Sequence, residues 1–211
     1  MRRLGVLGGT FDPIHYGHLD AAHAAREALS LDNILFVPAH DQPLRARDPR
    51  ATAFHRFAMV GLAINGCRGY RASDVELQRE GTSYTINTLQ HLHGEGWDPS
   101  QIFFILGSDA FAEIAKWRGY PGILDAARFA VVARPGTTIE SALARTPELR
   151  SHVSLIEAHT RDVSSTAIRQ RLSDGKSIED LVPAAVSRHI LAHHLYGAVD
   201  DLHGEDERTV S

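Results

Sequence analysis

Short apolar segments alternate with helical patterns along the chain, and this alternation limits the folds that are open to it. The expected strands cover residues 4–7, 34–37, 70–75, 102–106, 129–132 and 153–156. The expected helices cover residues 18–29, 54–64, 84–92, 109–117, 164–172 and 183–195. Such alternation is typical of a parallel sheet with helices on both faces. The sequence therefore predicts an α/β fold with a doubly wound, mostly parallel sheet, in which ligands bind beyond the carboxyl ends of the strands.

Length and charge fit one globular domain with an acidic tail. The chain has 211 residues, 43% of them hydrophobic, which is enough to bury a core. Residues 199–211 carry five acidic groups against Arg208, so the net charge of −4 belongs to this tail and the rest is neutral. We expect residues 1–198 to form a single domain and the tail to be disordered. A neutral body argues against nucleic acid as a partner, because non-specific binding needs a basic face.

Cysteine content and hydropathy indicate the cytoplasm. Cys67 is the only cysteine, so no internal disulfide is available and a reducing compartment fits. The apolar run at residues 4–7 is too short for a signal peptide, and no stretch approaches transmembrane length. We therefore expect a cytoplasmic protein without a membrane partner.

A segment rich in glycine and histidine joins the first expected strand to the first helix. It runs from Gly8 to His18 and reads Gly-Gly-Thr-Phe-Asp-Pro-Ile-His-Tyr-Gly-His. Gly8 and Gly9 lack a Cβ, so the backbone can approach a ligand closely. His15 and His18 lie three residues apart at a helix entrance, where unpaired N–H groups and the helix dipole favour a phosphate. Together with the Thr10 hydroxyl, these groups predict a cradle for a triphosphate.

Two other interpretations of the histidine pair stay open. A histidine taken alone is more often an ordinary surface or core residue of a tight turn. Two histidines three residues apart also suit zinc, although Asp12 and His23 nearby complete no known ligand spacing. The ordered string as a whole favours phosphate binding.

The same segment resembles the G-x-F-D-P-x-H-x-G-H signature of the nucleotidyltransferase superfamily with the His-x-Gly-His motif. It looks most like the form found in the bacterial nicotinate-nucleotide adenylyltransferase family, and the resemblance extends from Leu4 to about Tyr196. It implies a Rossmann-like nucleotidyltransferase fold. It also implies that ATP is bound by Gly8, Gly9 and Phe11, and that the catalytic residues are Thr10, His15 and His18.

A second motif, Ser-Ser-Thr-Ala-Ile-Arg, occupies residues 164–169. Serine and threonine at a helix start are natural N-caps, so alone the run is equally well a plain capping sequence. Arg169 follows Ser165 by one turn and can project over the same helix end, where arginine pairs with phosphate oxygens. The run resembles the superfamily's Ser-Ser-Thr-x-Ile-Arg motif, which implies that Ser165, Thr166 and Arg169 bind the β- and γ-phosphates of ATP.

Two further segments follow expected strands and resemble nucleotide-binding elements of the family. Gly-Ser-Asp at residues 107–109 matches the family's Gly-x-Asp pattern, and the Asp109 carboxylate can accept hydrogen bonds from a ribose or cap the next helix. Ala-Arg-Pro-Gly begins at residue 133. The resemblance implies that Gly107, Asp109 and Arg134 lie at the ATP.

Three elements bear on the second substrate. The run Ser83, Tyr84, Thr85 resembles the element that the nicotinate enzymes place near the pyridine ring, and Trp117 can stack on that ring or belong to the core. The family commonly has Pro-Pro-His-Lys after the second strand, whereas this chain has Gln-Pro-Leu-Arg ending at Arg45. Arg45 keeps a positive charge for the substrate, but the histidine is missing.

The resemblance implies adenylyl transfer from ATP to nicotinate mononucleotide, with Mg²⁺ entering with ATP, and with deamido-NAD and pyrophosphate as products. Phosphopantetheine or nicotinamide mononucleotide as acceptor stays an alternative, and so does a non-catalytic nucleotide sensor. Phosphopantetheine as acceptor fits poorly with the Ser-Tyr-Thr run and Trp117. A sensor fits poorly with the intact His15, His18 and Arg169. A homo-oligomer is also left open.

Several other patterns are expected to carry no chemistry. Gly175-Lys176-Ser177 imitates the end of a P-loop, but Gln170 stands where its first glycine belongs and no strand precedes it. The histidine pairs at residues 91 and 93 and at residues 193 and 194 are expected on helix surfaces.

Overall fold

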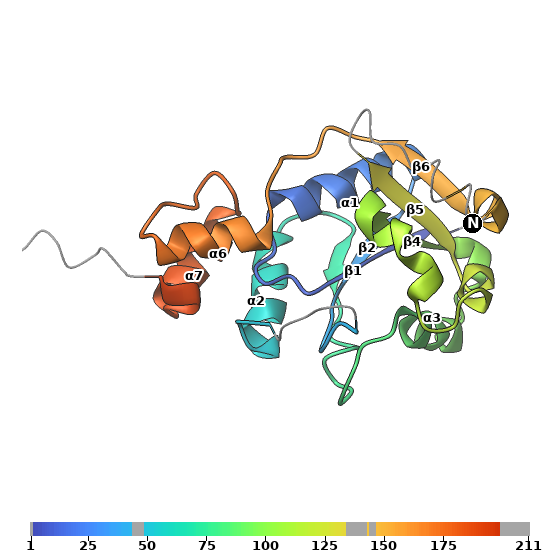
Figure 1. Cartoon of the computed structure of the whole chain (residues 1–211), viewed down its shortest axis with the longest axis horizontal. Helices are drawn as coiled ribbons and strands as arrows, with labels where there is room; N and C mark the ends of the chain where they lie inside the picture. Colours follow the sequence, from blue (N-terminus) through green and yellow to red (C-terminus); the bar gives the residue numbers. More distant parts are fainter. Residues whose placement is uncertain (1, 44–48, 134–142, 144–146, 199–211) are drawn as a thin grey trace, which may run out of the picture.

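The structure, a computed structural model, describes residues 2–43, 49–133, 143 and 147–198. Its centre is one six-stranded sheet in the order β3-β2-β1-β4-β5-β6, and every neighbouring pair of strands is parallel (Figure 1). The strands are β1 (Leu4–Gly9), β2 (Asn33–Pro38), β3 (Tyr70–Ala72), β4 (Ile102–Gly107), β5 (Arg128–Ala133) and β6 (Val153–Glu157). The predicted α/β fold is confirmed, and its sheet is wholly parallel.

Helices connect the strands and cover both faces of the sheet. The α-helices are α1 (Tyr16–Leu29), α2 (Ala53–Ala63), α3 (Thr85–Gly94), α4 (Ser108–Ala112), α6 (Ser165–Ser173) and α7 (Ala184–Ala192). Short 3₁₀ turns are η1 (Pro99–Gln101), η2 (Ile114–Lys116), η3 (Gly122–Asp125), η4 (Pro147–Ser151) and η5 (Leu195–Gly197). In the described part of the chain, no helix has the length and apolar character needed to cross a membrane.

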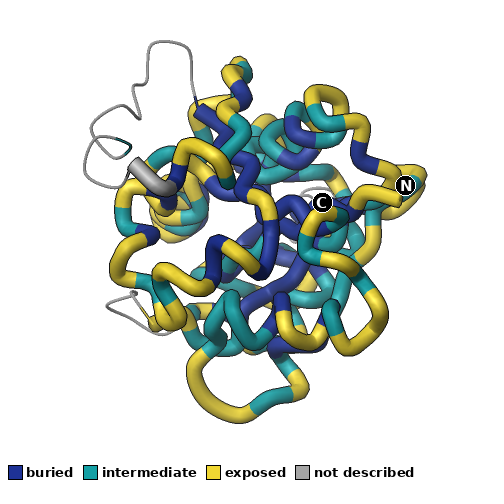
Figure 2. Tube along the Cα trace, turned by 90° about the vertical axis from the view of Figure 1, so that its right-hand side faces the viewer, coloured by how far each residue is buried: buried dark blue, intermediate teal, exposed yellow. Residues whose placement is uncertain are grey.

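Alternation of side chains along the strands produces two cores, one on each face of the sheet. In β4, Phe103 and Ile105 face the core under α1, α2, α6 and α7, whereas Ile102, Phe104 and Leu106 face the core under α3 and α4. Figure 2 shows the buried chain running through the middle of the molecule between exposed outer segments. Helices on both faces explain why β4 is almost continuously apolar.

The strand order creates one place at which a ligand can enter the sheet. From β1 the chain proceeds outward through β2 and β3, and it then returns to the other side of β1 to place β4, β5 and β6. The connections leaving β1 and β4 therefore diverge to opposite sides. In open α/β sheets, such a divergence opens a crevice at the carboxyl ends of the two strands.

Two elements are shorter than expected from the sequence. The helix predicted for residues 109–117 ends as an α-helix at Ala112 and continues as the 3₁₀ turn η2. Phe111 and Ile114 are buried and Trp117 is partly buried, and their spacing of three suits the tighter 3₁₀ winding. The third strand pairs with β2 only over residues 70–72, after which the chain leaves the edge of the sheet.

Arg56 of α2 fixes the loops that follow β1 and β2. Its side chain is only 2% exposed. Its guanidinium donates hydrogen bonds to the carbonyl oxygens of Thr10 (2.9 Å), Ala39 (2.5 Å) and His40 (3.2 Å). Because arginine carries several donors in one planar fork, a single side chain holds both loops at the crevice.

We expect Arg56→Met to lower the free energy of unfolding by at least about 3 kcal/mol, because it leaves buried carbonyl oxygens without their charged donor. Arg71→Met on the exposed edge strand is the matched control and should change stability by less than about 0.5 kcal/mol. Urea unfolding of the three proteins measures both values. Equal midpoints for the wild type and Arg56→Met would contradict this account of the loops.

Candidate active site

A cavity of about 1140 Å³ lies at the carboxyl ends of β1 and β4, in the crevice that the strand order predicts. Residues of several sequence motifs, which lie far apart along the chain, contribute to its wall. The predicted site residues that line it are Gly8, Gly9, His15, His18, Ser83, Tyr84, Thr85, Gly107, Asp109 and Trp117. The tertiary structure thus brings together segments that are about 100 residues apart.

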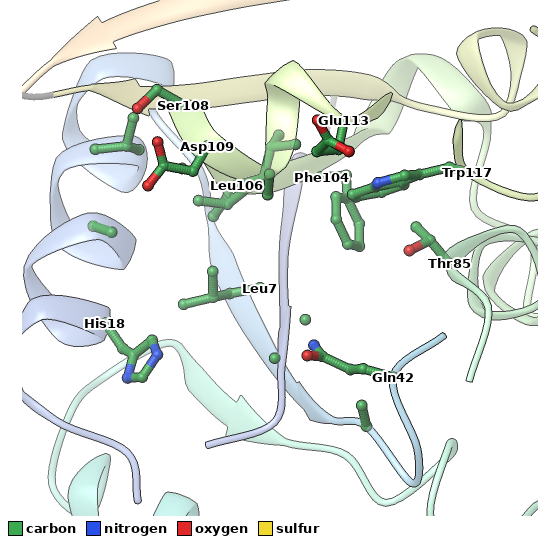
Figure 3. A pocket seen from close by; sticks show the side chains of 18 of the residues that line it. Leu7, His18, Gln42, Thr85, Phe104, Leu106, Ser108, Asp109, Glu113 and Trp117 are labelled. Atoms are coloured by element: carbon green, nitrogen blue, oxygen red, sulfur yellow. The ribbon is translucent and has the colours of Figure 1, made fainter. Parts of the chain in front are cut away.

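The polar groups of the cavity are divided between its two sides. Figure 3 shows His18 and Asp109 on one side, Trp117 and Thr85 on the other, and Phe104 between them. The cavity therefore has an imidazole and carboxylate end and an aromatic end, and both open to the same space.

His15 and His18 form a stacked pair at the start of α1. Their ring centroids are 3.7 Å apart and the planes differ by 26°. His15 occupies the N-cap, and its backbone N–H donates to Nδ1 of His18 at 3.2 Å. Because Nδ1 of His18 accepts this bond, the proton of the neutral ring lies on Nε2. The backbone thus selects the tautomer that leaves Nε2–H as a donor.

Burial keeps both imidazoles neutral before substrate arrives. Desolvation lowers the pKa of His15 to about 4, with Asp20 opposing this through its charge. Desolvation, followed by the proximity of His15, lowers the pKa of His18 well below its usual value. A polyanionic ligand in the cavity opposes both effects, because a nearby negative charge favours the imidazolium.

Glycine in this motif is required by packing as well as by access to a ligand. A Cβ on Gly17 would lie 3.2 Å from the His15 ring and 3.3 Å from the Arg161 carbonyl oxygen. A Cβ on Gly9 would lie 3.2 Å from the ring of Phe11. The histidine stack therefore requires glycine at position 17, and the placement of the Phe11 ring requires glycine at position 9.

Thr10 and Phe11 lie behind the cavity wall and do not line it. The Thr10 hydroxyl is buried and has no hydrogen-bond partner among the residues that the structure describes. The Phe11 ring meets His18 edge-on, at a centroid distance of 5.0 Å. In this structure Phe11 thus supports His18.

The second motif docks against the first at the start of α6. The Ser164 side chain caps α6 by accepting from the Ala167 N–H at 3.1 Å, as the capping interpretation predicts. The Ser165 hydroxyl donates to the Pro13 carbonyl at 2.9 Å. Ser165, Thr166 and Arg169 lie beside the cavity but are not among the residues that line it.

Asp12 joins the two motifs, a role that the sequence analysis missed. Its buried carboxylate accepts hydrogen bonds from the N–H groups of Arg50 (2.9 Å) and Ala51 (3.0 Å) and from the Tyr196 hydroxyl (2.8 Å). Arg169 donates to the Asp12 carbonyl at 2.7 Å and lies 3.8 Å from its carboxylate. The sequence offered Asp12 only as a neighbour of the histidine pair in the zinc alternative, and it contained no sign of the contact with Tyr196.

Burial and the Asp12 carboxylate together raise the pKa of Tyr196. The phenol therefore stays protonated and remains a hydrogen-bond donor to Asp12. This holds the C-terminal turn η5 against the first motif.

Gly107 and Asp109 follow β4 as expected. Gly107 takes the N-cap position of α4, and no side chain caps this helix. The capping role considered for Asp109 is thus wrong, and its carboxylate lies at the cavity wall (Figure 3).

The aromatic end of the cavity is built from two loops. Ser83 accepts from the His40 N–H at 2.9 Å, which ties the Ser-Tyr-Thr segment to the loop after β2. Trp117 meets Phe104 edge-on at 5.8 Å and lines the cavity, so it belongs both to the core and to the site. The Arg118 guanidinium lies 4.6 Å from the centre of the Tyr84 ring.

Three sequence predictions fall outside the described residues: Arg45, Arg134 and the tail at residues 199–211. Arg161, which the sequence analysis did not select, lines the cavity and lies 3.9 Å from the centre of the Tyr16 ring. Its backbone and side chain both donate to Asp20.

We expect the buried His15 to make stability fall with acidity. Its pKa is about 4 in the folded chain and about 6.5 unfolded, so between these values the unfolded chain binds the extra proton. Lowering the pH from 6.5 to 5 should therefore reduce the free energy of unfolding by about 1–2 kcal/mol. His15→Asn keeps an N-cap residue and should lose that part of the slope, whereas His23→Asn on the exposed face of α1 should retain it. Urea unfolding at both pH values tests this; equal slopes in all three proteins would refute it.

Comparison with known proteins agrees with the geometry. Residues 6–171 match the family described as cytidylyltransferase-like. A probable nicotinate-nucleotide adenylyltransferase from Roseiflexus sp. (strain RS-1) is 46% identical over 195 residues, which cover 92% of this chain and 97% of that protein. Another, from Herpetosiphon aurantiacus, is 38% identical and covers 93% of this chain and 99% of the relative.

A solved structure shares the fold. Plasmodium falciparum nicotinic acid mononucleotide adenylyltransferase complexed with NaAD superposes with a TM-score of 0.76 at 20% identity, covering 94% of this chain and 99% of that one. The sheet is therefore the Rossmann-like nucleotidyltransferase sheet that the resemblance implied. With the motifs in place around one cavity, the chain belongs to the cytidylyltransferase-like family, in the group of the nicotinate-nucleotide adenylyltransferases.

Proposed function

We propose that this chain transfers the adenylyl group of ATP to nicotinate mononucleotide, giving deamido-NAD and pyrophosphate. The observation that carries the proposal is one cavity with a stacked pair of imidazoles at one end and aromatic rings at the other. Its volume of about 1140 Å³ exceeds the range of about 300–1000 Å³ usual for single-ligand sites, which leaves room for two nucleotides. The names of the relatives support the same reaction.

The reaction asks the protein for positioning and charge stabilisation. An oxygen of the mononucleotide phosphate attacks the α-phosphorus of ATP in line, and the bond to the bridging oxygen of pyrophosphate breaks. The attacking phosphate is already an anion, so no general base is needed. We assign to Nε2–H of His18 the donation of a hydrogen bond to the α-phosphate as negative charge develops, with His15 and Thr10 behind it.

Ser165, Thr166 and Arg169 are proposed to hold the leaving pyrophosphate from the edge of the cavity. Arg169 already donates to the Thr166 hydroxyl at 3.1 Å, so the two side chains are pre-positioned at the start of α6. Magnesium is proposed to enter with ATP, held mainly by the phosphates and water. The described wall of the cavity offers no group of three carboxylate, imidazole or thiolate ligands, which suits that mode.

Charge at the aromatic end supports the acid over the amide. Glu113 pairs with Lys116 in the cavity wall, and the Glu76 carboxyl, whose pKa is raised by burial, accepts a hydrogen bond from Thr88. Arg118, whose guanidinium lies over the Tyr84 ring, places a positive charge beside these groups. An anionic ring substituent gains from that charge and a neutral amide does not. A chain with a single cysteine can form no internal disulfide, which fits a reducing compartment and supports the cytoplasm as the place of action.

Magnesium-dependent release of pyrophosphate from ATP tests the proposed function. Nicotinate mononucleotide, nicotinamide mononucleotide and phosphopantetheine are offered in parallel at equal concentration. Fastest release with the first supports the proposal. Faster release with another acceptor overturns the substrate, and ATP binding without release overturns catalysis in favour of a sensor.

We expect His18→Ala to lower kcat by about 10²–10³-fold, the usual loss when one pre-organised donor to the developing charge is removed. His23→Ala is the matched control, since this exposed histidine lies on the same helix outside the cavity, and its kcat should stay unchanged. Steady-state assays of the three proteins give the comparison. Wild-type turnover in His18→Ala would remove this histidine from the reaction.

Trp117→Ala should raise KM for the mononucleotide roughly tenfold, because stacking on one base is worth about 1–3 kcal/mol. The value of KM for ATP should stay within about twofold if the two nucleotides occupy opposite ends of the cavity. The chain has one other tryptophan, Trp97, which packs on the same core but does not line the cavity. If Trp97→Ala raises the same KM equally, the effect of Trp117 is structural and the stacking role is wrong.

A further inference from the structure

Three histidines meet on the outer side of α2 and α7, outside the set of residues that line the cavity. His189 and His193 are four residues apart at the end of α7, and His55 reaches them from α2. The ring centroid of His55 lies 5.2 Å from that of His189 and 4.9 Å from that of His193. The centroids of His189 and His193 are 4.4 Å apart. His193 is exposed on the helix surface, as predicted from the sequence, and its ring also lies beside those of His55 and His189.

The nitrogen atoms of the three rings converge. One ring nitrogen from each histidine lies within 4.8 Å of the other two. Nδ1 of His55 and Nε2 of His189 are 3.1 Å apart. Three nitrogens bound to one tetrahedral zinc ion at about 2.0–2.1 Å are separated by about 3.3 Å from one another. The nitrogens of His55 and His189 thus have nearly the spacing that a shared ion requires, and the exposed His193 offers its ring nitrogen within 4.8 Å of both.

We propose that His55, His189 and His193 form a binding site for a divalent transition metal, zinc being the natural occupant, which clips α7 to α2. Three imidazoles suit zinc and neighbouring metals, whereas Mg²⁺ and Ca²⁺ prefer oxygen ligands. His193 is exposed, so the fourth coordination position opens to water. The proposal does not rest on the adenylyl transfer proposed for the cavity.

The position of the histidine cluster links the proposed metal site to the active site. Arg56, the residue after His55, holds the loops beneath the first motif. The chain after His193 leads directly to Tyr196, which donates to Asp12. A metal bridging α2 and α7 therefore fixes two elements that both reach Asp12 and its loop.

Competition against a chromogenic zinc chelator measures binding to the full-length chain after removal of metal. His193→Ala removes the exposed ligand with little effect on packing, and His55→Gln removes the ligand on the other helix. His23→Ala on exposed α1 deletes a histidine outside the cluster and serves as the control. We expect one tight site in the wild type and in the control. The affinity of this site for zinc should fall by about 100-fold or more in both cluster variants. This exceeds the loss of about 10–100-fold that is typical when a residue that only hydrogen-bonds a metal ligand is removed.

Cobalt and thermal melting complete the test. Cobalt bound to the wild type should show the visible absorption of a nitrogen-rich site of low coordination number, and His193→Ala should lack it. Zinc should raise Tm of the wild type and of His23→Ala, but not of His193→Ala, because only a ligand of the folded state stabilises it. The proposal is overturned if zinc affinity in His193→Ala stays within threefold of the wild type, or if the wild type binds zinc no more tightly than His55→Gln.

Discussion

The buried carboxylate of Asp12 is the point on which the remainder of the site depends. It accepts hydrogen bonds from two backbone N–H groups before α2 and from the Tyr196 hydroxyl, and it lies 3.8 Å from Arg169. A buried carboxylate is tolerated only when its lone pairs are satisfied, so each of these partners must be in place. The requirement ties the loop of the first motif to α2, α6 and the C-terminal turn, although they are far apart in sequence.

The loop held in this way presents two neutral imidazoles to the cavity. Desolvation lowers the pKa of both, and the backbone N–H of His15 fixes the tautomer of His18. The same arrangement that destabilises charge in the empty site becomes favourable when a triphosphate brings negative charge. The loss of stability in acid and the response of the two rings to a bound anion thus both follow from the burial of these imidazoles.

The two ends of the cavity are supported by different parts of the fold. The imidazole end rests on α1, α6 and the loop after β1 that Arg56 holds, whereas the aromatic end rests on η2 and the Ser-Tyr-Thr segment, which Ser83 ties to the loop after β2. Variants at one end can therefore be compared with variants at the other. The proposed metal clip between α2 and α7 would act on the imidazole end through Tyr196, and on the loops after both β1 and β2 through Arg56.

The sequence by itself determined the alternation of strands and helices, and with it the parallel sheet and the edge at which ligands bind. It also placed His15, His18 and Asp109 at that edge, because local patterns encode which residues follow a strand. Only the tertiary structure decided the rest. The contact of Asp12 with Tyr196 spans 184 residues, and the meeting of His55 with His189 spans 134, so neither leaves a local pattern. Helix packing sets such contacts, and their energies depend on burial that no short stretch of sequence records.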